Sequence, residues 1–582
     1  MKGIQPLVIS RYDAEHPYSR YLIEILAAEG FNSVRVMAPE QVRELLRPDQ
    51  SGCVVVAQVP LGRDLRDQLL TYVRSGGGAV LMRPDAELAR ALGLQPRGSH
   101  SGGYLWPVAE HPLCPTKLPP YMQFHGGAEF YEAAGASPMA LFGSKEEAGT
   151  SPAIATGTFG RGRFAVFAYD LAASTVIFHQ GRPEQSSTGP EWPGNPTSYY
   201  TPADMFTGLL DFDLRKVPQA DFQQRMFSRA VEWVYEAAGP LPRLWYYPYA
   251  ARALQFLNGD GDSMRHDELV TMIDLMEKYD APYAAYLMMD DHPKVAPAEV
   301  TEWMERGHSF GQHVWAGPRP SPDELDERIT WETEQFRNRY GFTPLTTRNH
   351  CVIWTGWVDT AKSLERNGVR LDLNYRAAHD YRDGYLTGSG LPMRFMDEDG
   401  AFIDVYEQET LTCDDFILVH KSAHPVSTVN EAVDVSRQYL QDAVESGHTV
   451  VHQYFHPVYA RTDWDRPYTP PWLEGTLQAA RELDVPAVGA DSWVHFNDGR
   501  RETAIDQVDW DQDSSRLTFR VATPERIDGL TITVPASHGD LRAMNVHVDG
   551  EANDLHVDDI QGKEYVFVVV SEGADRVQVS YS

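Results

Sequence analysis

Cysteine is scarce in this chain, and the few cysteines present lie far apart. Only four occur among 582 residues, at positions 53, 114, 351 and 413, and no two of them form a C-x-x-C pair. Disulfide-stapled domains and zinc-finger modules both depend on several closely spaced cysteines. The sequence therefore disfavours both kinds of architecture.

Long apolar runs are also missing. No apolar stretch reaches the roughly 18 residues that a bilayer-spanning helix needs. The first residues lead directly into a strand-like segment at 7–10, without the basic segment, apolar stretch and cleavage site of a secretory signal. We therefore expect a cytoplasmic protein with no membrane partner, unless a signal peptide has been removed.

Positive charge is in short supply as well. The 51 Lys and Arg residues face 83 Asp and Glu residues, which gives a net charge of −32 at pH 7. Such a charge disfavours nucleic acid and anionic membranes as partners, and it makes a strongly anionic polysaccharide a poor substrate. The content of 42% hydrophobic and 11% aromatic residues is that of a folded globular protein.

A chain of this length exceeds one hydrophobic core, and its first 240 residues form one predicted unit. Apolar runs alternate there with helical patterns, and the runs lie at 7–10, 33–37, 53–59 and 79–82. This alternation predicts a mostly parallel sheet covered by helices. The stretch from the glycine-rich segment 98–103 to about residue 159 is predicted to be less regular and rich in loops. Gly-Pro-Leu-Pro at 239–242 marks the expected boundary.

The rest of the chain divides into two further predicted domains. Residues 241–497 again alternate strand and helix patterns, beginning with a strand at 253–257 and a helix at 266–278, which suits a β/α barrel. Residues 498–582 contain short alternating strands separated by Gly, Asp and Ser turns, which predicts a small β-sandwich. The expected fold class is therefore α/β with a C-terminal sandwich.

Two acidic residues, Asp260 and Asp262, follow the first apolar run of the second domain in the segment Asn-Gly-Asp-Gly-Asp-Ser. Side chains two residues apart on a strand point to the same face, and the carboxyl end of a barrel strand faces the catalytic mouth. One carboxylate can then hold a metal while the other acts as a base on the same water. The alternative is a turn that only caps the next helix.

Four later segments carry further candidate groups at barrel-like intervals. They are Gly307-His308-Ser309-Phe310-Gly311-Gln312-His313, Thr347-Arg348-Asn349-His350-Cys351, Arg370-Leu371-Asp372-Leu373-Asn374-Tyr375 and Thr449-Val450-Val451-His452-Gln453-Tyr454-Phe455-His456-Pro457. In this order, and with Asp260 and Asp262 ahead of them, the segments resemble the motifs of the NodB-homology polysaccharide deacetylases. The resemblance covers residues 241–497 and implies a distorted β/α barrel.

The resemblance implies that Asp260 is the base and that Asp262 and His313 bind a divalent metal, Zn²⁺ by preference. The second metal histidine of the family would stand at position 317, where this chain has a glycine. His350 ends the next predicted strand and is our candidate for the missing ligand, although a histidine bonded to a backbone carbonyl is the alternative. His308 lies five residues from His313, hence on the opposite strand face, and we assign it a structural role.

The remaining motifs suggest roles for three more residues. The resemblance implies that Arg348 is the arginine of the third motif and that Asp372 orients active-site groups. A buried aspartate paired with Arg370 or Arg348 is an equally good interpretation of Asp372. His456 would be the general acid, with His452 on the same strand face as the second choice. A histidine that merely closes the strand is the alternative for His456.

Residues 1–240 resemble the flavodoxin-like fold of class I glutamine amidotransferases, in the non-catalytic form found as the trimerisation domain of some β-galactosidases. An active amidotransferase needs a cysteine at a tight Gly-x-Cys-x-Gly turn, and neither Cys53 nor Cys114 stands in one. We expect this domain to serve assembly, as in a homo-oligomer, or to supply a substrate loop. The C-terminal sandwich either binds carbohydrate or covers the barrel.

Aromatic side chains near the motifs are candidates for stacking on sugar rings, with core packing as the alternative. They are Trp315, Trp354, Trp357, Tyr375, Tyr381, Tyr454, Tyr459 and Trp464.

The sequence thus predicts a metal-dependent hydrolase that removes acetyl groups from an N- or O-acetylated carbohydrate. A metal-independent amidohydrolase acting on a small cyclic amide is one alternative, because the second motif histidine is absent. A catalytically inactive carbohydrate-binding or scaffold protein is the other.

Overall fold

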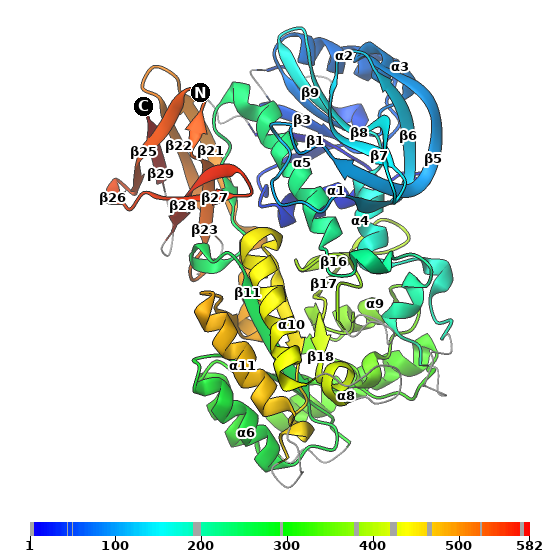
Figure 1. Cartoon of the computed structure of the whole chain (residues 1–582), viewed down its shortest axis with the longest axis vertical. Coiled ribbons are helices and arrows are strands. Elements are labelled where there is room, and N and C mark those ends of the chain that lie inside the picture. The colour runs from blue at the N-terminus through cyan, green and yellow to red at the C-terminus, as the bar shows by residue number, and fades with distance from the viewer. Residues whose placement is uncertain are drawn as a thin grey trace.

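A computed structural model of the chain has a mixed α/β fold with curled, half-barrel sheets (Figure 1). It describes residues 5–42, 45–48, 51–189, 199–290, 295–376, 383–419, 428–461, 468–523, 527–570 and 576–582. These residues form four hydrogen-bonded sheets of nine, ten, six and four strands. The blue-to-cyan N-terminal part and the orange-to-red C-terminal part lie beside each other, above the green-to-yellow middle of the chain.

One half of the nine-stranded sheet is parallel, as the sequence predicts. Its strands, in spatial order, are β2 (Arg35–Met37), β1 (Leu7–Ile9), β3 (Cys53–Val56), β4 (Gly78–Met82) and β9 (Gly162–Phe167). The strands β1, β3 and β4 are buried along their whole length, which explains their unbroken apolar sequences. The helices that accompany this half are α1 (Tyr21–Ala28), α2 (Arg63–Arg74), α3 (Ala86–Ala91), α4 (Leu171–Gln180) and α5 (Gln219–Tyr235).

The other half of this sheet corrects the prediction of a loop-rich stretch. It consists of long antiparallel strands, β8 (Ala148–Phe159), β7 (Ser137–Gly143), β5 (Leu94–Pro107) and β6 (Met122–Ala133). The register of β5 against β6 shifts between Pro96 and Gly98 and again between Ser101 and Gly103, where Gly98 and Gly103 have positive φ. Glycine-containing bulges interrupt the alternation of apolar and polar residues, so the sequence hides these strands.

The ten-stranded sheet, here called the half-barrel, carries the predicted motifs. Its strand order is β16-β17-β15-β14-β13-β12-β11-β19-β18, with β20 also paired to β11. The strand bounds are β11 (Leu254–Asp260), β12 (Ala284–Leu287), β13 (Ser309–Gln312), β14 (Thr346–Thr347), β15 (Leu371–Asp372), β16 (Met393–Met396), β17 (Phe402–Glu407), β18 (Thr412–Cys413), β19 (Val450–Tyr454) and β20 (Ala487–Val488). Among the described residues this ladder runs from β16 to β18 as a curled sheet, which fits an α/β fold, while the distorted barrel itself stays a prediction.

Helices between these strands, and one after β20, accompany the half-barrel. They are α6 (His266–Glu277), α7 (Pro297–Glu305), α8 (Pro322–Tyr340), α9 (Asp359–Arg366), α10 (Val429–Asp442), α11 (Thr469–Glu482) and α12 (Ala490–Glu502). The longest, α8, begins with a proline at its first position, and the Ser321 hydroxyl accepts a hydrogen bond from the Glu324 backbone N–H. None of the helices in the described residues is long and apolar enough to cross a lipid bilayer.

The last part of the chain forms the six- and four-stranded sheets. Their strands are β21 (Ala504–Asp511), β22 (Arg516–Ala522), β23 (Thr531–Pro535), β24 (Ser537–His538), β25 (Leu541–Val548), β26 (Glu551–Asn553), β27 (His556–Ile560), β28 (Lys563–Val569) and β29 (Arg576–Tyr581). A further strand, β10 (Arg243–Leu244), pairs with β23. The segment just after the expected boundary at 239–242 is therefore part of a C-terminal sheet. The domain limits themselves stay a prediction.

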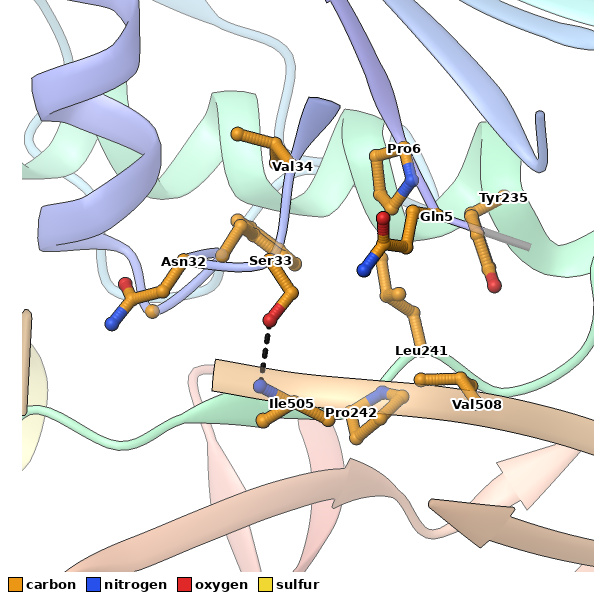
Figure 2. A pocket seen from close by; sticks show the side chains of 12 residues that line it. Gln5, Pro6, Asn32, Ser33, Val34, Tyr235, Leu241, Pro242, Ile505 and Val508 are labelled. Atoms are coloured by element: carbon orange, nitrogen blue, oxygen red, sulfur yellow. Dashed lines mark hydrogen bonds between the residues drawn. The ribbon is translucent and has the colours of Figure 1, made fainter. Parts of the chain in front are cut away.

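Buried polar contacts join the N-terminal part to the rest of the chain. The Glu232 carboxylate on α5 contacts Arg243 and Lys563, and Glu24 on α1 binds Arg394 and Arg501. Nearby, the Ser33 hydroxyl accepts a hydrogen bond of 2.6 Å from the Ile505 backbone N–H, beside a cavity of about 20 Å³ (Figure 2). A cavity of this size holds about one water molecule, so it is a packing gap in the joint and not a ligand site.

Candidate functional site

The predicted site residues meet at the carboxyl edge of the half-barrel. Asp260 ends β11 and Asp262 follows it, while His313 comes directly after β13. His350 stands in a short 3₁₀ helix (His350–Val352) after β14, and His456 follows β19. Because all these strands run parallel, their carboxyl ends bring residues almost 200 positions apart into one cluster.

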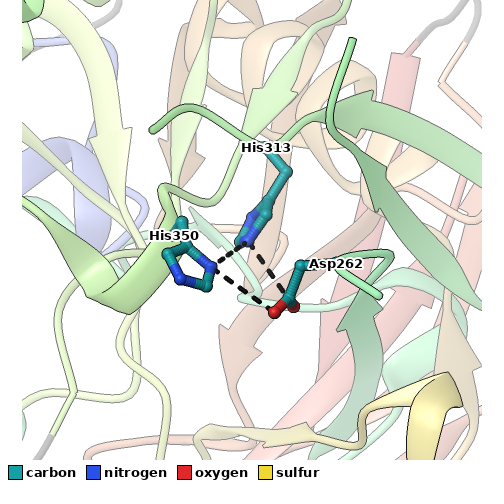
Figure 3. Close-up of side chains that lie close together, drawn as sticks. All are labelled: Asp262, His313 and His350. Atoms are coloured by element: carbon teal, nitrogen blue, oxygen red, sulfur yellow. Dashed lines mark hydrogen bonds and ion pairs between the residues drawn. The ribbon is translucent and has the colours of Figure 1, made fainter. Parts of the chain in front are cut away.

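Asp262, His313 and His350 form a compact group of ligand atoms (Figure 3). The Nε2 atom of His313 lies 3.2 Å from Nδ1 of His350 and 3.9 Å from Oδ1 of Asp262. Nδ1 of His350 lies 3.7 Å from Oδ2 of Asp262. Donor atoms around a tetrahedral zinc ion lie about 3.3 Å apart, so a divalent cation fits among these three with small adjustments. Metal binding itself stays a prediction.

The protonation of His313 also suits a metal ligand. Its Nδ1–H donates a 2.7 Å hydrogen bond to the Arg348 carbonyl, which leaves the lone pair of Nε2 directed at His350 and Asp262. Burial lowers the pKa of His313 to about 3, so its imidazole is neutral near pH 7. Burial likewise lowers the pKa of His350. Both rings are therefore in the form that binds metals.

Asp262 carries the negative charge of the group. Burial tends to raise its pKa, but a hydrogen bond with Asp260 and the neighbouring imidazoles outweigh burial and hold the pKa well below its usual range. Asp262 is therefore ionised over the whole physiological pH range.

The position at which the resemblance would place a second metal histidine has free space around it. Gly317 has a φ of +91°, and a Cβ atom added there would meet no other atom within 4 Å. His350 comes close to His313 from the next loop, where Cys351 has a positive φ of 54°. His308 lies apart from the group, since its Nδ1 accepts from the Tyr283 N–H and its Nε2 contacts Glu277. These contacts fit the structural role that its strand position predicts.

Asp260 lies between the metal-ligand group and His456. Its Oδ2 atom is 3.3 Å from Nε2 of His313 and 3.7 Å from Nε2 of His456. The side chain is almost fully buried, and its Oδ1 atom has no hydrogen-bond partner among the described residues. Burial, followed by the charge of Asp262, raises the pKa of Asp260 well above that of an exposed aspartate. A buried carboxyl group with a raised pKa and an unpaired oxygen is a candidate for proton exchange.

His456 is held by a carboxylate that sequence reasoning missed. Its Nδ1 donates a 2.5 Å hydrogen bond to Oδ1 of Asp414, and its backbone N–H donates to Oδ2 at 2.8 Å. The Thr469 hydroxyl donates to the same Oδ2 at 2.6 Å. Burial opposes a charged imidazole, but the carboxylates of Asp260, Asp414 and Asp415 outweigh burial and raise the pKa of His456 well above its usual value. His456 is therefore an imidazolium, which is the form of a general acid.

Arg348 contacts the metal-ligand group through its backbone carbonyl. Its carbonyl orients His313, while its buried guanidinium lies 4.0 Å from the ring centre of Tyr454 and donates to the Thr410 hydroxyl at 2.6 Å. Burial lowers the pKa of Arg348 to about 10. Its Nε and Nη1 atoms have no partner among the described residues.

Asp372 lacks the partners that the sequence suggests. Its carboxylate accepts hydrogen bonds from the side chain and backbone of Asn374, at 2.5 and 3.2 Å. Arg370 pairs instead with Asp404 and Asp498, and the hydrogen bonds of Arg348 go elsewhere. Burial raises the pKa of Asp372 to about 7. A role in orienting active-site groups stays a prediction.

His452, the second choice for the general acid, is fully buried within β19. Its Nδ1 donates to the Glu409 carbonyl at 2.9 Å, its Nε2 contacts Asn258, and its ring stacks on Phe256. These contacts occupy both ring nitrogens, so His452 has no nitrogen left for a substrate.

Four of the six aromatic candidates for sugar stacking that lie in the described residues are core residues. Trp354, Trp357, Tyr375 and Tyr454 are at least nine-tenths buried, so they offer no open face. Tyr459 is half-buried, and its hydroxyl donates to Asp415. Trp315 is also half-buried and lies against His350. Tyr381 and Trp464 lie outside the described residues.

The two cysteines considered for the N-terminal part are both buried. Burial raises the pKa of the Cys53 thiol to about 12 and that of the Cys114 thiol to about 11. Neither thiol is therefore activated as a nucleophile.

Comparisons with known proteins give only distant likenesses. No family model matches the chain, and no curated protein matches it. Among solved structures, a protein from Mycobacterium smegmatis that is provisionally assigned as a polysaccharide deacetylase is 13% identical, with a TM-score of 0.34, over 44% of this chain and 94% of that one. The β-galactosidase of Bacillus circulans is 11% identical, with a TM-score of 0.24, over 29% of each chain. The exo-β-1,4-mannosidase of an Opitutaceae bacterium is 19% identical, with a TM-score of 0.23, over 30% of this chain and 32% of that one.

The chain thus spans nearly all of the Mycobacterium protein but only about three-tenths of the two glycosidases. Likenesses with TM-scores this low establish neither a family nor an activity.

Proposed function

We propose that this chain is a metal-dependent hydrolase that removes acetyl groups from an N- or O-acetylated carbohydrate. The observation that supports the proposal most directly is the Asp262–His313–His350 group next to the buried Asp260–His456 pair. One half of this arrangement can hold a cation, and the other half can move protons.

The donor set of one carboxylate and two neutral imidazoles suits Zn²⁺. Asp262, His313 and His350 would hold the ion. When bound there, it would polarise an acetyl carbonyl, acidify a water and favour the ionised form of Asp260.

The side chains around the ion have complementary tasks in this proposal. Asp260, whose Oδ1 atom has no hydrogen-bond partner among the described residues, takes a proton from the attacking water. His456 enters as the imidazolium and gives its Nε2 proton to the departing nitrogen or oxygen of the sugar. Asp414 holds the other ring nitrogen, so the acidic Nε2–H of His456 lies on the side of Asp260. Each of the two proton transfers contributes about 10²–10⁴ in rate in comparable enzymes.

The test is a joint measurement of metal content and acetate release. Purified protein should contain about one divalent ion per chain and should release acetate from acetylated sugars. A protein that binds no metal under any reconstitution, and releases no acetate, would contradict the proposal.

A metal-independent amidohydrolase acting on a small cyclic amide is the second candidate. The observation that favours it is Gly317, since the family's second metal histidine is missing while the Asp260–His456 pair is complete. Turnover of cyclic imides or ureides after chelation of all metal would support it over the deacetylase. We propose further that residues 1–240 form a non-catalytic amidotransferase-like domain that serves assembly of a homo-oligomer.

A further inference from the structure

A segment from the N-terminal part of the chain borders the mouth of the half-barrel. The Tyr200 N–H donates a 3.0 Å hydrogen bond to the Pro318 carbonyl, and the Trp354 N–H donates a 2.9 Å bond to the Tyr200 carbonyl. Pro318 belongs to the loop that begins at His313, and Trp354 belongs to the loop that carries His350. The segment at Tyr200 is therefore fixed between the two loops that supply the imidazoles of the metal-ligand group.

This attachment brings two aromatic rings next to the metal-ligand group. The ring of Trp315 stands edge-on to His350, with 4.8 Å between the ring centres and an angle of 87°. The ring of Tyr199 lies 6.3 Å from that of Trp315. Both side chains are half-buried, so each still has an exposed part. Burial, followed by the nearby thiol of Cys351, raises the pKa of Tyr199.

The surroundings of the two rings favour a neutral polar ligand. The side chains of Asp262 and Asp415 are 30% and 29% exposed at the same mouth, and the whole chain carries a charge of −32. These charges repel an anionic polymer. Carboxylates accept hydrogen bonds from hydroxyl and amide groups, while aromatic faces pack against C–H groups. A pyranose ring offers both kinds of partner.

We propose that Tyr199 and Trp315 form an aromatic wall that binds the sugar ring adjoining the reacting acetyl group. This proposal rests on the function proposed above and makes the N-terminal part of the chain a determinant of substrate specificity. Tyr199 and Trp315 act by binding and not by catalysis. Their loss should therefore weaken binding of the sugar more than it slows turnover of a small acetyl ester.

The experiment compares variants that lose one of the two aromatic rings with variants that keep an aromatic ring at the same position. Trp315→Ala and Tyr199→Ala remove a ring each, while Trp315→Phe and Tyr199→Phe keep one. Trp331→Ala is the control, since Trp331 is 36% exposed on α8 and its ring packs under Arg328 and not against His350. Calorimetry with a tetramer of N-acetylglucosamine measures binding to the metal-loaded proteins. Acetate release from the same tetramer and from triacetin, an ester without a sugar ring, measures turnover.

Each alanine variant should bind the tetramer about ten-fold more weakly and raise its KM by a similar factor. The phenylalanine variants and Trp331→Ala should stay within about two-fold of the unaltered protein, and all variants should keep their metal. Two results would contradict the proposal that Tyr199 and Trp315 bind the sugar. One is equal binding of the tetramer by all of the proteins, and the other is no binding of the tetramer to the unaltered protein. If no acetate is released from any substrate, the deacetylase proposal fails, while the binding comparison still decides the role of the two rings.

Discussion

Asp414 binds His456 through both of its carboxylate oxygens, one to the imidazole Nδ1 and the other to the backbone N–H. The two residues lie 42 positions apart and come from the ends of the paired strands β18 and β19. This double contact fixes both the position and the tautomer of the histidine. It also places a negative charge behind the ring, which favours the imidazolium.

The first prediction concerns this pair. Asp414→Asn should lower kcat about 10²-fold or more, because the acid loses both its orientation and part of its positive charge. The sign of the pH effect follows from the pKa. His456 must be protonated to act, so activity is lost as pH rises through its raised pKa. Removing the Asp414 charge lowers that pKa, and the alkaline limb of the kcat profile should move to lower pH.

Thr469→Val is the matched control for Asp414→Asn. It removes the hydroxyl bond to Asp414 at 2.6 Å but leaves both contacts to His456 in place. Its kcat should change by less than about ten-fold, and its pH profile should not move. A profile that is the same in Asp414→Asn and in the unaltered protein would contradict the role of Asp414.

The second prediction concerns the metal-ligand group. Asp262→Asn and His350→Ala should each lose bound divalent metal, because removing one of three protein ligands weakens a site of this kind severely. His308→Gln should keep the metal, since His308 contacts Tyr283 and Glu277 and not the group. Mass spectrometry of the purified proteins gives the ions per chain. Loss of metal in Asp262→Asn but not in His350→Ala would return His350 to a structural role.

The third prediction separates two buried aspartates. Asp260→Asn should lower acetate release about 10²–10⁴-fold while metal is retained, because an amide cannot accept the proton. Asp372→Asn should change the rate less than about ten-fold. Its carboxyl bonds only to Asn374 among the described residues, and a pKa of about 7 means that it is partly neutral already. A loss in Asp372→Asn as large as that in Asp260→Asn would show that Asp372 does orient the active site.

The sequence predicts the cluster because its members stand next to recognisable strands. Asp260, His313 and His456 each stand at or just after the end of a predicted strand, and the alternation of strands and helices places these strand ends at one edge. Asp414 gives no such signal. Its strand β18 has only two residues, and its partner lies far away in the chain. Thr412 and Cys413 followed by two consecutive aspartates are the only local hint.

The sequence also does not predict the long strands β5 and β6 or the position of Tyr199. Glycines at register shifts conceal the long strands β5 and β6. Tyr199 stands in the N-terminal part of the chain, and the hydrogen bonds of Tyr200 to two distant loops help to bring it to the site. Hydrophobic periodicity predicts the secondary structure of a segment. It does not indicate which distant backbone atoms will form hydrogen bonds with that segment.

The last prediction concerns the joint between α5 and the C-terminal sheets. Glu232 is buried against Arg243 and Lys563, and its carboxylate also accepts a hydrogen bond from the Tyr565 hydroxyl at 2.7 Å. Burial disfavours its charge, but Lys563, Arg243 and Arg229 outweigh burial and lower its pKa to about 2. Because the pKa of Glu232 is lowered on folding, its ionised carboxylate stabilises the folded protein. This contribution is fully present above the pKa of a glutamate in the unfolded chain, about 4.3, and it is lost as pH falls toward about 2.

Glu232→Gln should therefore destabilise the protein at pH 7 by about 3 kcal/mol or more, because it leaves buried cations without their partner. The difference from the unaltered protein should shrink as pH falls from about 4.3 to 2, since the carboxylate itself then takes up a proton. Glu564→Gln is the control, because Glu564 follows Lys563 on strand β28 but pairs with Arg542 in a largely exposed contact. Such a pair contributes less than about 1 kcal/mol to the free energy of unfolding. Thermal unfolding at pH 7 and pH 3 makes the comparison, and equal shifts in Tm for both variants at pH 7 would show that the joint does not depend on Glu232.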